Sequence, residues 1–240
     1  NNDIQVLRAV AITFVIIHHI PLNLIQQLSP RVELFYSFFY GAVGVDLFFV
    51  ISGFVISRSL LDSFSKENKH DALKFFWIKR ACRILPAAWI WLALILVLTV
   101  VFNTSGAFGS FQAAFGGAVA ALLNVANVRF AECYGYFECG PTVVYWSLSL
   151  EEQFYIFLPF IILLSRRFLP GVLIIFAISQ ILFDPLRLLA TFRITGLALG
   201  VILGWYSNCK EYQILFVAAA DRVKARLVAF LLLLCLAVVL

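Results

Sequence analysis

Charged residues are scarce in this sequence, and their scarcity excludes an ordinary soluble globular domain. Asp, Glu, Lys and Arg make up 13% of the 240 residues, whereas hydrophobic residues make up 63% and mean hydropathy is +0.98. A soluble domain is usually about half apolar and about a quarter charged. The composition therefore predicts an integral membrane protein.

Three further absences narrow the class. Methionine is missing altogether, so the sequence has no initiator, and its last stretch, 227–240, is apolar to the end. We therefore expect a fragment or processed chain, incomplete at its C-terminal side. The five cysteines show no zinc-like CxxC pairing, and no metal site is predicted. No low-complexity linker or repeat is present, so we expect a single domain over 1–240.

Long apolar runs dominate what is present. A membrane-spanning helix needs about 20 mainly apolar residues. The runs predict spans near 4–25, 40–61, 84–103, 144–165 and 187–206, a shorter one at 168–183 and a last one from 227. The stretch 108–128 is rich in Ala and Gly, and it either spans or re-enters. The predicted fold class is all-α, a polytopic transmembrane helix bundle with about 7–8 spans.

The net charge of +5 is assigned to membrane topology rather than to nucleic-acid binding, because basic residues gather on cytoplasmic loops. The segment 58–83 holds seven of the 18 Lys and Arg residues and is predicted to be a cytoplasmic loop. The N-terminus then lies inside and the loop 29–39 outside. If 166–167 and 210–226 are also cytoplasmic, 108–128 cannot be a simple full crossing. Cys133 and Cys139 would then bracket an extracytoplasmic loop, where they could pair.

The first span carries Arg8, His18 and His19, and ionisable residues within a span are functional candidates by default. Arg8 and His19 are eleven residues apart, so they share one helix face about 16 Å apart along the axis, while His18 points away. An imidazole can take a proton from a hydroxyl near neutral pH, as acyl transfer to an alcohol requires. The alternative is a hydrogen-bonded structural histidine.

The second span contains Gly41-Ala-Val-Gly-Val-Asp-Leu-Phe-Phe-Val-Ile-Ser-Gly-Phe54. Gly44 and Gly53 permit close helix contact. Asp46 enters an otherwise apolar run. A structural ion pair with an arginine such as Arg8 is favoured over a direct chemical role for Asp46.

Arg80 and Arg83, followed by Pro86, are i, i+3 neighbours where a helix starts. Arginine binds phosphate groups with a planar fork, so the pair suits a phosphorylated ligand at the inner boundary. Ordinary flanking charge explains the spacing equally well.

The segment Trp146-Ser-Leu-Ser-Leu-Glu-Glu-Gln-Phe-Tyr155 places Ser147, Glu151 and Tyr155 on one helix face. Glu151 and Glu152 are adjacent carboxyls within a span, which is costly. One of them could orient an imidazole, as acids do in hydrolytic triads. The alternative is an interfacial segment with both acids in water. Further along, Gly196, Gly200 and Gly204 recur after Arg193 in a helix-packing pattern.

In this order, these segments resemble the acyltransferase-3 family of integral membrane O-acyltransferases, whose members O-acetylate cell-surface glycans such as O-antigen (lipopolysaccharide), peptidoglycan and nodulation factors. The matching features are Arg8 with His19, the run 44–54, Arg80-x-x-Arg83, the run 146–155, Phe154-Tyr-x-x-x-Pro159 and the glycine-rich helix. The resemblance covers nearly the whole chain. It implies a bundle of roughly ten helices in a bacterial inner membrane, of which this chain lacks the C-terminal ones, and in some members an extracytoplasmic SGNH-type domain follows.

The resemblance also implies the chemistry and the roles of residues. The donor would be acyl-CoA, usually acetyl-CoA, met on the cytoplasmic side as a co-substrate, and the acceptor a glycan hydroxyl outside; no bound cofactor is implied. His19 would be the general base or acyl acceptor, Glu151 its acidic partner, and Arg8 would orient or charge-balance the site. Arg80 and Arg83 would engage CoA phosphates. The remaining candidates for substrate contacts are Asp46, Ser147, Ser149, Glu152 and Tyr155.

A transporter is the main competing hypothesis. A proton-coupled transporter or flippase for glycans or acyl groups would use the intramembrane acids and histidine as a proton relay, without turnover of acyl-CoA. A degenerate family member with a structural or signalling role is a third hypothesis. The presence of every implied catalytic residue argues against it.

Overall fold

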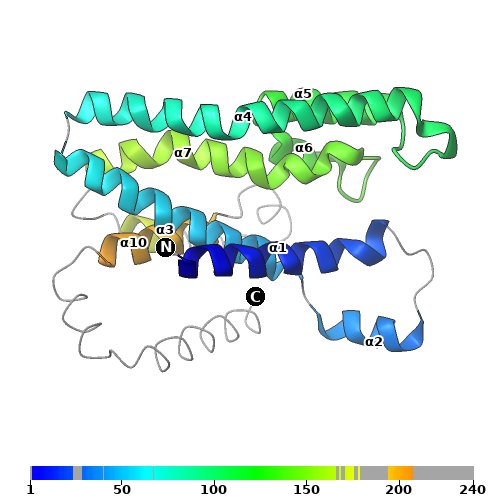
Figure 1. Ribbon diagram of the computed structural model, residues 1–240, viewed down its shortest axis with the longest axis horizontal. Coiled ribbons are helices and arrows are strands. Elements are labelled where there is room, and N and C mark those ends of the chain that lie inside the picture. Colours follow the sequence, from blue (N-terminus) through cyan, green and yellow to red (C-terminus); the bar gives the residue numbers. More distant parts are fainter. Residues whose placement is uncertain are drawn as a thin grey trace. The chain divides into compact units, whose positions relative to one another are not determined.

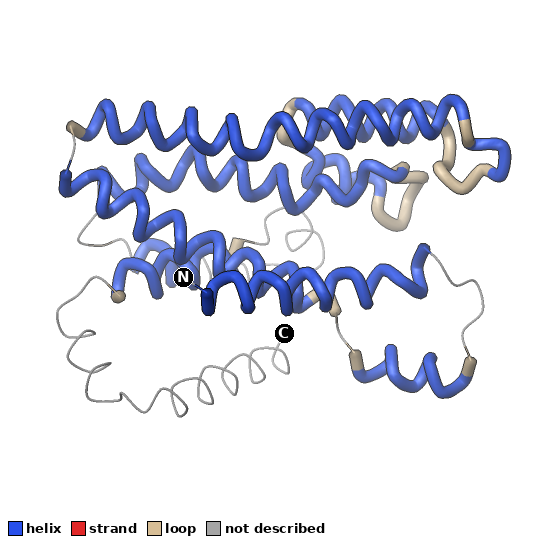
Figure 2. The backbone as a smooth tube through the Cα atoms, viewed as in Figure 1, coloured by secondary structure: helices blue, strands red, loops and turns tan. Residues whose placement is uncertain are grey.

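The computed structural model describes residues 2–23, 29–39, 41–66, 68–165, 168, 171–175, 178 and 194–207. All regular structure within these ranges is helical (Figure 2), which confirms the predicted all-α class. Four helices in this part are long and apolar enough to cross a membrane: α1 (Asn2–Asn23), α3 (Val43–Lys66), α4 (Lys69–Val101) and α7 (Trp146–Ser165), the last entered through the 3₁₀ turn η2 (Pro141–Tyr145).

The remaining predicted spans are covered less completely. The short helix α10 (Thr195–Tyr206) occupies the second half of the predicted span 187–206. The span predicted from 227 lies outside the described residues, and 168–183 lies largely outside them. The total of seven to eight spans therefore stays a prediction.

The chain divides into two compact units, each described by itself: Asn1–Arg58 with Leu199–Leu240, and Ser59–Ala198. This division into units does not test the expectation of a single domain, which stays a prediction.

Glycine residues determine the packing of the first unit. A Cβ atom on Gly44 of α3 would lie 2.6 Å from the carbonyl oxygen of Ala11 in α1, so only glycine allows this approach. A Cβ atom on Gly200 or Gly204 of α10 would overlap α3 in the same way. The predicted packing role is confirmed at these two glycines.

The segment 29–39, predicted to be an outer loop, contains a short helix. Helix α2 (Pro30–Phe38) begins with a proline in its first turn, where the missing N–H needs no partner. The Tyr36 hydroxyl donates a hydrogen bond of 3.0 Å to the carbonyl of Ile17 and ties α2 to α1. This connection is therefore helical, and its predicted position outside the membrane stays a prediction.

The basic segment 58–83, predicted to be a cytoplasmic loop, belongs largely to two helices, and its position on the cytoplasmic side stays a prediction. Helix α3 continues to Lys66, and α4 begins at Lys69. An i, i+4 ion pair of 2.8 Å between Lys66 and Asp62 supports the end of α3, and the Asn68 side chain caps α4 by accepting from the N–H of His70. Because helical backbone bonds continue past an apolar run, hydrophobicity alone did not mark where these helices end. Helix α4, with its 33 residues, is about 50 Å long, longer than a hydrocarbon core of about 30 Å.

Between α4 and α7 the chain forms a hairpin of two short helices, α5 (Phe111–Leu122) and α6 (Ala126–Cys133), after the turn η1 (Asn103–Ser105). In Figure 1, α5 runs alongside α4 while α6 lies against α7. At about 18 Å and 12 Å the two helices are too short to cross a bilayer. The backbone N–H of Ser110 donates to Glu138 Oε1 at 2.9 Å, so the start of the hairpin and the loop after it lie next to each other. This geometry favours re-entry of the stretch 108–128, the second of the two predicted alternatives, and the topology there stays a prediction.

A disulfide joins Cys133 and Cys139 directly after α6, with their Cα atoms 5.2 Å apart. The sequence left this pairing conditional on an oxidising compartment. The disulfide agrees with an extracytoplasmic position for the open side of the hairpin.

Candidate functional site

Helix α7 carries both acids in its second turn. Glu151 and Glu152 are half-buried, and each has one carboxylate oxygen shielded from solvent. Water cannot fully stabilise charge at such atoms, so the surrounding protein has to do so. The predicted alternative of two fully wet acids does not fit this burial.

Arg80 of α4 faces the same part of α7. Its guanidinium carbon lies 5.5 Å from the ring centroid of Tyr155 and 5.9 Å from that of Phe76, distances typical of cation–π contacts. Glu152 and Tyr155 are i, i+3 neighbours on α7, so Arg80 lies near the turn of α7 that carries Glu152. The structure thus brings together three predicted site residues, Arg80, Glu152 and Tyr155.

Pro159 explains how α4 and α7 are locked at this level. Proline has no N–H, so the carbonyl of Tyr155, four residues earlier, loses its helical partner. The indole N–H of Trp77 on α4 donates to that carbonyl at 3.2 Å. The proline therefore leaves a free acceptor on α7, and a side chain of α4 donates to it. Trp77 was not predicted from the sequence.

The tip of the α5–α6 hairpin is hydrogen-bonded to the face of α7 that carries Ser149 and Gln153. The Ser149 hydroxyl, which is buried, accepts from the backbone N–H of Ala126 at 3.2 Å. The side-chain amides of Gln153 and Asn127 donate to each other's oxygens at 2.9 and 3.3 Å. Gln153 and Asn127 were not predicted from the sequence as functional candidates. An asparagine directly after an apolar stretch rich in Ala and Gly was a usable signal. Ser149 supports the hairpin in this structure, and its predicted contact with substrate stays a prediction.

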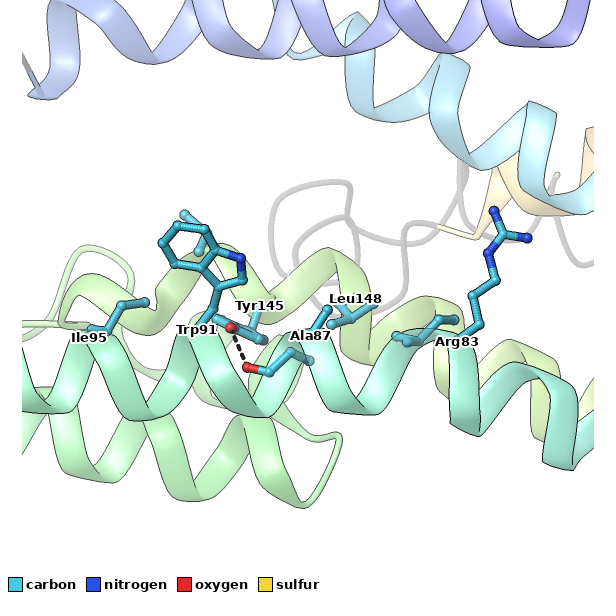
Figure 3. A pocket seen from close by; sticks show the side chains of 9 residues that line it. Arg83, Ala87, Trp91, Ile95, Tyr145 and Leu148 are labelled. Atoms are coloured by element: carbon cyan, nitrogen blue, oxygen red, sulfur yellow. Dashed lines mark hydrogen bonds between the residues drawn. The ribbon is translucent and has the colours of Figure 1, made fainter.

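Arg83 is exposed along an open groove of about 480 Å³ between α4 and the start of α7, whereas Arg80 does not line this groove. Figure 3 shows Arg83 at one end of the labelled lining residues and Ile95 at the other. The Tyr145 hydroxyl donates to the carbonyl of Ala88 at 2.9 Å (Figure 3). This hydrogen bond satisfies both of these polar groups in the mostly apolar lining of the groove. The two arginines, three residues apart, thus have different surroundings: Arg80 lies against aromatic rings, and Arg83 faces the groove.

In the other unit, a single helix, α1, contains Arg8, His18 and His19, as predicted. His19 Nδ1 lies 2.8 Å from the carbonyl oxygen of Val15. A carbonyl only accepts, so Nδ1 donates, and in the neutral ring Nε2 carries the lone pair. The rings of His18 and His19 meet edge to face with centroids 5.3 Å apart.

Arg8 and Asp46 are both half-buried. Arg8 Nε is shielded from solvent and has no hydrogen-bond partner among the residues that the structure describes. Asp46 lies in the first turn of α3, where the helix dipole favours a carboxylate.

Several sequence predictions stay predictions. His19 belongs to one unit and Glu151 to the other, and their partnership is still a hypothesis. The same holds for Ser147, which is half-buried in the first turn of α7, and for the roles of Arg8 and Asp46.

Comparison with known proteins gives consistent matches. The family model described as an acyltransferase domain matches residues 1–240. The O-acetyltransferase OatA of Staphylococcus aureus (strain NCTC 8325 / PS 47) is 34% identical over 169 residues, covering 68% of this chain and 25% of that protein. The peptidoglycan O-acetyltransferase OatA of Listeria monocytogenes is 31% identical over 170 residues, 69% of this chain and 24% of its own length.

A third relative, the putative peptidoglycan O-acetyltransferase YrhL of Bacillus subtilis, is 32% identical over 158 residues, 64% of this chain and 22% of its own length. The chain thus spans about a quarter of the length of the curated relatives it matches. No solved structure matches the chain significantly.

Proposed function

The chain belongs to the acyltransferase domain family, and on this premise we propose that it forms part of a membrane O-acyltransferase. The enzyme moves an acyl group, acetyl in the simplest case, from cytoplasmic acyl-CoA to a hydroxyl of a cell-surface or exported glycan. Two of the relatives are named peptidoglycan O-acetyltransferases, one of them putatively, which favours a cell-wall glycan as the acceptor. The proposed location is the bacterial inner membrane, with several crossings of the chain.

The observation that carries the chemistry is the hydrogen bond between His19 Nδ1 and the carbonyl of Val15. In the neutral ring it selects the tautomer with the lone pair on Nε2, which is the form needed for a general base or an acyl acceptor. As base, Nε2 takes the proton of the glycan hydroxyl while the oxygen attacks the thioester carbonyl, and CoA leaves as the thiol. As acceptor, Nε2 attacks the thioester carbonyl and displaces CoA as the thiolate. The glycan hydroxyl then attacks the acyl-imidazole, the imidazole leaves, and the hydroxyl proton ends on the CoA thiolate.

The basic residues of α4 support the binding of the donor. CoA is polyanionic, and the exposed guanidinium of Arg83 is accessible to phosphate groups from the groove. Arg80 is less exposed and lies against Tyr155, the i+3 neighbour of Glu152. We propose that Arg83 contacts CoA phosphates and that Arg80 does so in concert with Glu152.

His19→Ala tests this function in proteoliposomes supplied with labelled acetyl-CoA and a glycan acceptor. Loss of the base should reduce acetyl transfer by about 100-fold or more, with normal insertion into the membrane. His18→Ala is the matched control, because it removes the neighbouring imidazole and should retain transfer. Full activity of His19→Ala would refute the catalytic role. Proton-coupled glycan flux without consumption of acetyl-CoA would support the transporter instead.

A further inference from the structure

Gln153 and Asn127 form a buried amide network that the proposed reaction does not use. Gln153 Nε2 donates to the backbone carbonyl of Asn124 at 2.7 Å and to Asn127 Oδ1 at 2.9 Å, while Asn127 Nδ2 donates to Gln153 Oε1 at 3.3 Å. The Asn127 side chain is fully buried. Unbonded amides inside a membrane protein are costly, so the two side chains depend on each other.

A second bond joins the hairpin tip to α7 one turn earlier. Ser149 and Gln153 are i, i+4 neighbours and lie on one face of the helix. The Ser149 hydroxyl accepts from the N–H of Ala126, beside the Asn127 contact. Two attachments on successive turns of one face restrict rotation of α7 about its axis.

That rotation determines the direction of an acid. Glu152 precedes Gln153 and projects about 100° around the helix from it. On that side lies Arg80 of α4, whose guanidinium carbon is 5.5 Å from the ring centroid of Tyr155, the i+3 neighbour of Glu152. Helix α7 is also held there by the bond from Trp77 to the carbonyl of Tyr155. Glu152 therefore lies on a helix that is hydrogen-bonded to α4 through Trp77 and to the α5–α6 hairpin through Ser149 and Gln153.

We infer that Gln153 and Asn127 are positioning residues whose amide pair sets the rotation of α7 and keeps Glu152 facing Arg80. The pair touches no reacting atom and acts through the helix. Its effect on activity rests on the proposed function, whereas its effect on the orientation of Glu152 does not.

The test uses Asn127→Leu, Gln153→Leu and the exchanged pair Asn127→Gln/Gln153→Asn. The exchange keeps both amides and their combined length, so it can re-form the network. Gln112→Leu is the matched control, because Gln112 is an exposed amide on the same hairpin. Should the leucine variants fail to insert, Asn127→Ser and Gln153→Ser, which add no apolar bulk, make the same comparison.

Two readouts are measured on the protein in membranes. Mass spectrometry follows the rate at which dicyclohexylcarbodiimide, a membrane-soluble carboxyl reagent, modifies Glu152. Steady-state kinetics follow acetyl transfer. Each single variant should change the labelling rate severalfold and lower kcat by about 10- to 100-fold, with little change in KM for acetyl-CoA, because a small displacement of an active-site group is enough. The exchanged pair should recover both quantities, and Gln112→Leu should alter neither.

Unchanged labelling of Glu152 in the single variants would overturn the positioning role, whatever happens to activity. Failure of the exchanged pair to recover labelling would also overturn it. If the parent protein transfers no acetyl group, the proposed function fails, and the labelling comparison still decides the positioning role.

Discussion

At the scale of single residues, Pro159 and Trp77 illustrate how a backbone defect becomes a specific contact. The proline leaves the Tyr155 carbonyl without its helical donor, and the Trp77 indole supplies one from α4. Trp77 also packs against Phe160, with ring centroids 5.6 Å apart. One side chain thus contributes both a hydrogen bond and apolar contact to the α4–α7 interface.

Trp77→Phe should lower the free energy of unfolding by about 1–3 kcal/mol, because it keeps a ring at the interface and leaves a buried carbonyl without a donor. In a Pro159→Ala background the same substitution should cost less, since an alanine at that position has the backbone N–H that can bond the Tyr155 carbonyl. Denaturant unfolding of the four proteins in detergent measures this coupling. Equal costs in both backgrounds would show that the hydrogen bond is not the source of the effect.

At the scale of elements, the α5–α6 hairpin combines two faces of opposite character. Its lipid-compatible side exposes large apolar residues at helical spacing, namely Phe111, Phe115, Val119 and Leu122. Its inner side is made of buried small residues such as Ala114 and Ala118. Small residues let two backbones approach closely, and the exposed apolar residues suit hydrocarbon. This division is expected for a re-entrant hairpin whose tip is buried in protein.

Re-entry predicts that both ends of the hairpin are accessible from the same side of the membrane. With free cysteines such as the exposed Cys82 replaced by serine, single cysteines at Ser110 and Tyr136 should both react with an impermeant maleimide from outside intact cells. A cysteine at Lys69 should react only after permeabilisation and serves as the control. Labelling of Ser110→Cys and Tyr136→Cys from opposite sides would mean that 111–133 crosses the membrane.

At the scale of the whole molecule, the proposed reaction is vectorial, with the donor on the basic side and the acceptor on the disulfide side. Arg80→Ala combined with Arg83→Ala should therefore raise the KM for acetyl-CoA by about tenfold or more and leave the KM for the glycan little changed, because charge-assisted bonds to phosphate are lost. Lys74→Ala with Lys79→Ala removes two exposed charges from the same helix and is the matched control.

An unchanged KM together with reduced amounts of protein in the membrane would assign the two arginines to topology alone. A similar rise in KM for the lysine variant would indicate general electrostatic attraction of CoA rather than a specific site. Both outcomes are distinguishable from the proposed one by quantifying inserted protein alongside the kinetics.

The sequence by itself determined the membrane character, the helical class and most of the candidate residues, because apolar run length and intramembrane charge are local properties of the chain. It also indicated that Gly200 and Gly204 pack closely, since glycine spacing reports on backbone approach. The last turn of α3 and the start of α4 could not be predicted from hydrophobicity. Asp62 and Lys66 continue α3 where hydrophobicity falls, and Asn68 caps α4.

Only the tertiary structure decided that 111–133 forms a hairpin of two short helices, that Arg80 and Arg83 have different surroundings, and that Trp77, Asn127 and Gln153 hold α7. These features depend on contacts between residues 26 to 78 positions apart. A lone tryptophan, asparagine or glutamine has many possible partners, and nothing in the local sequence states which one it meets. The packing of α4, α6 and α7 makes that choice by bringing a particular donor to each buried acceptor.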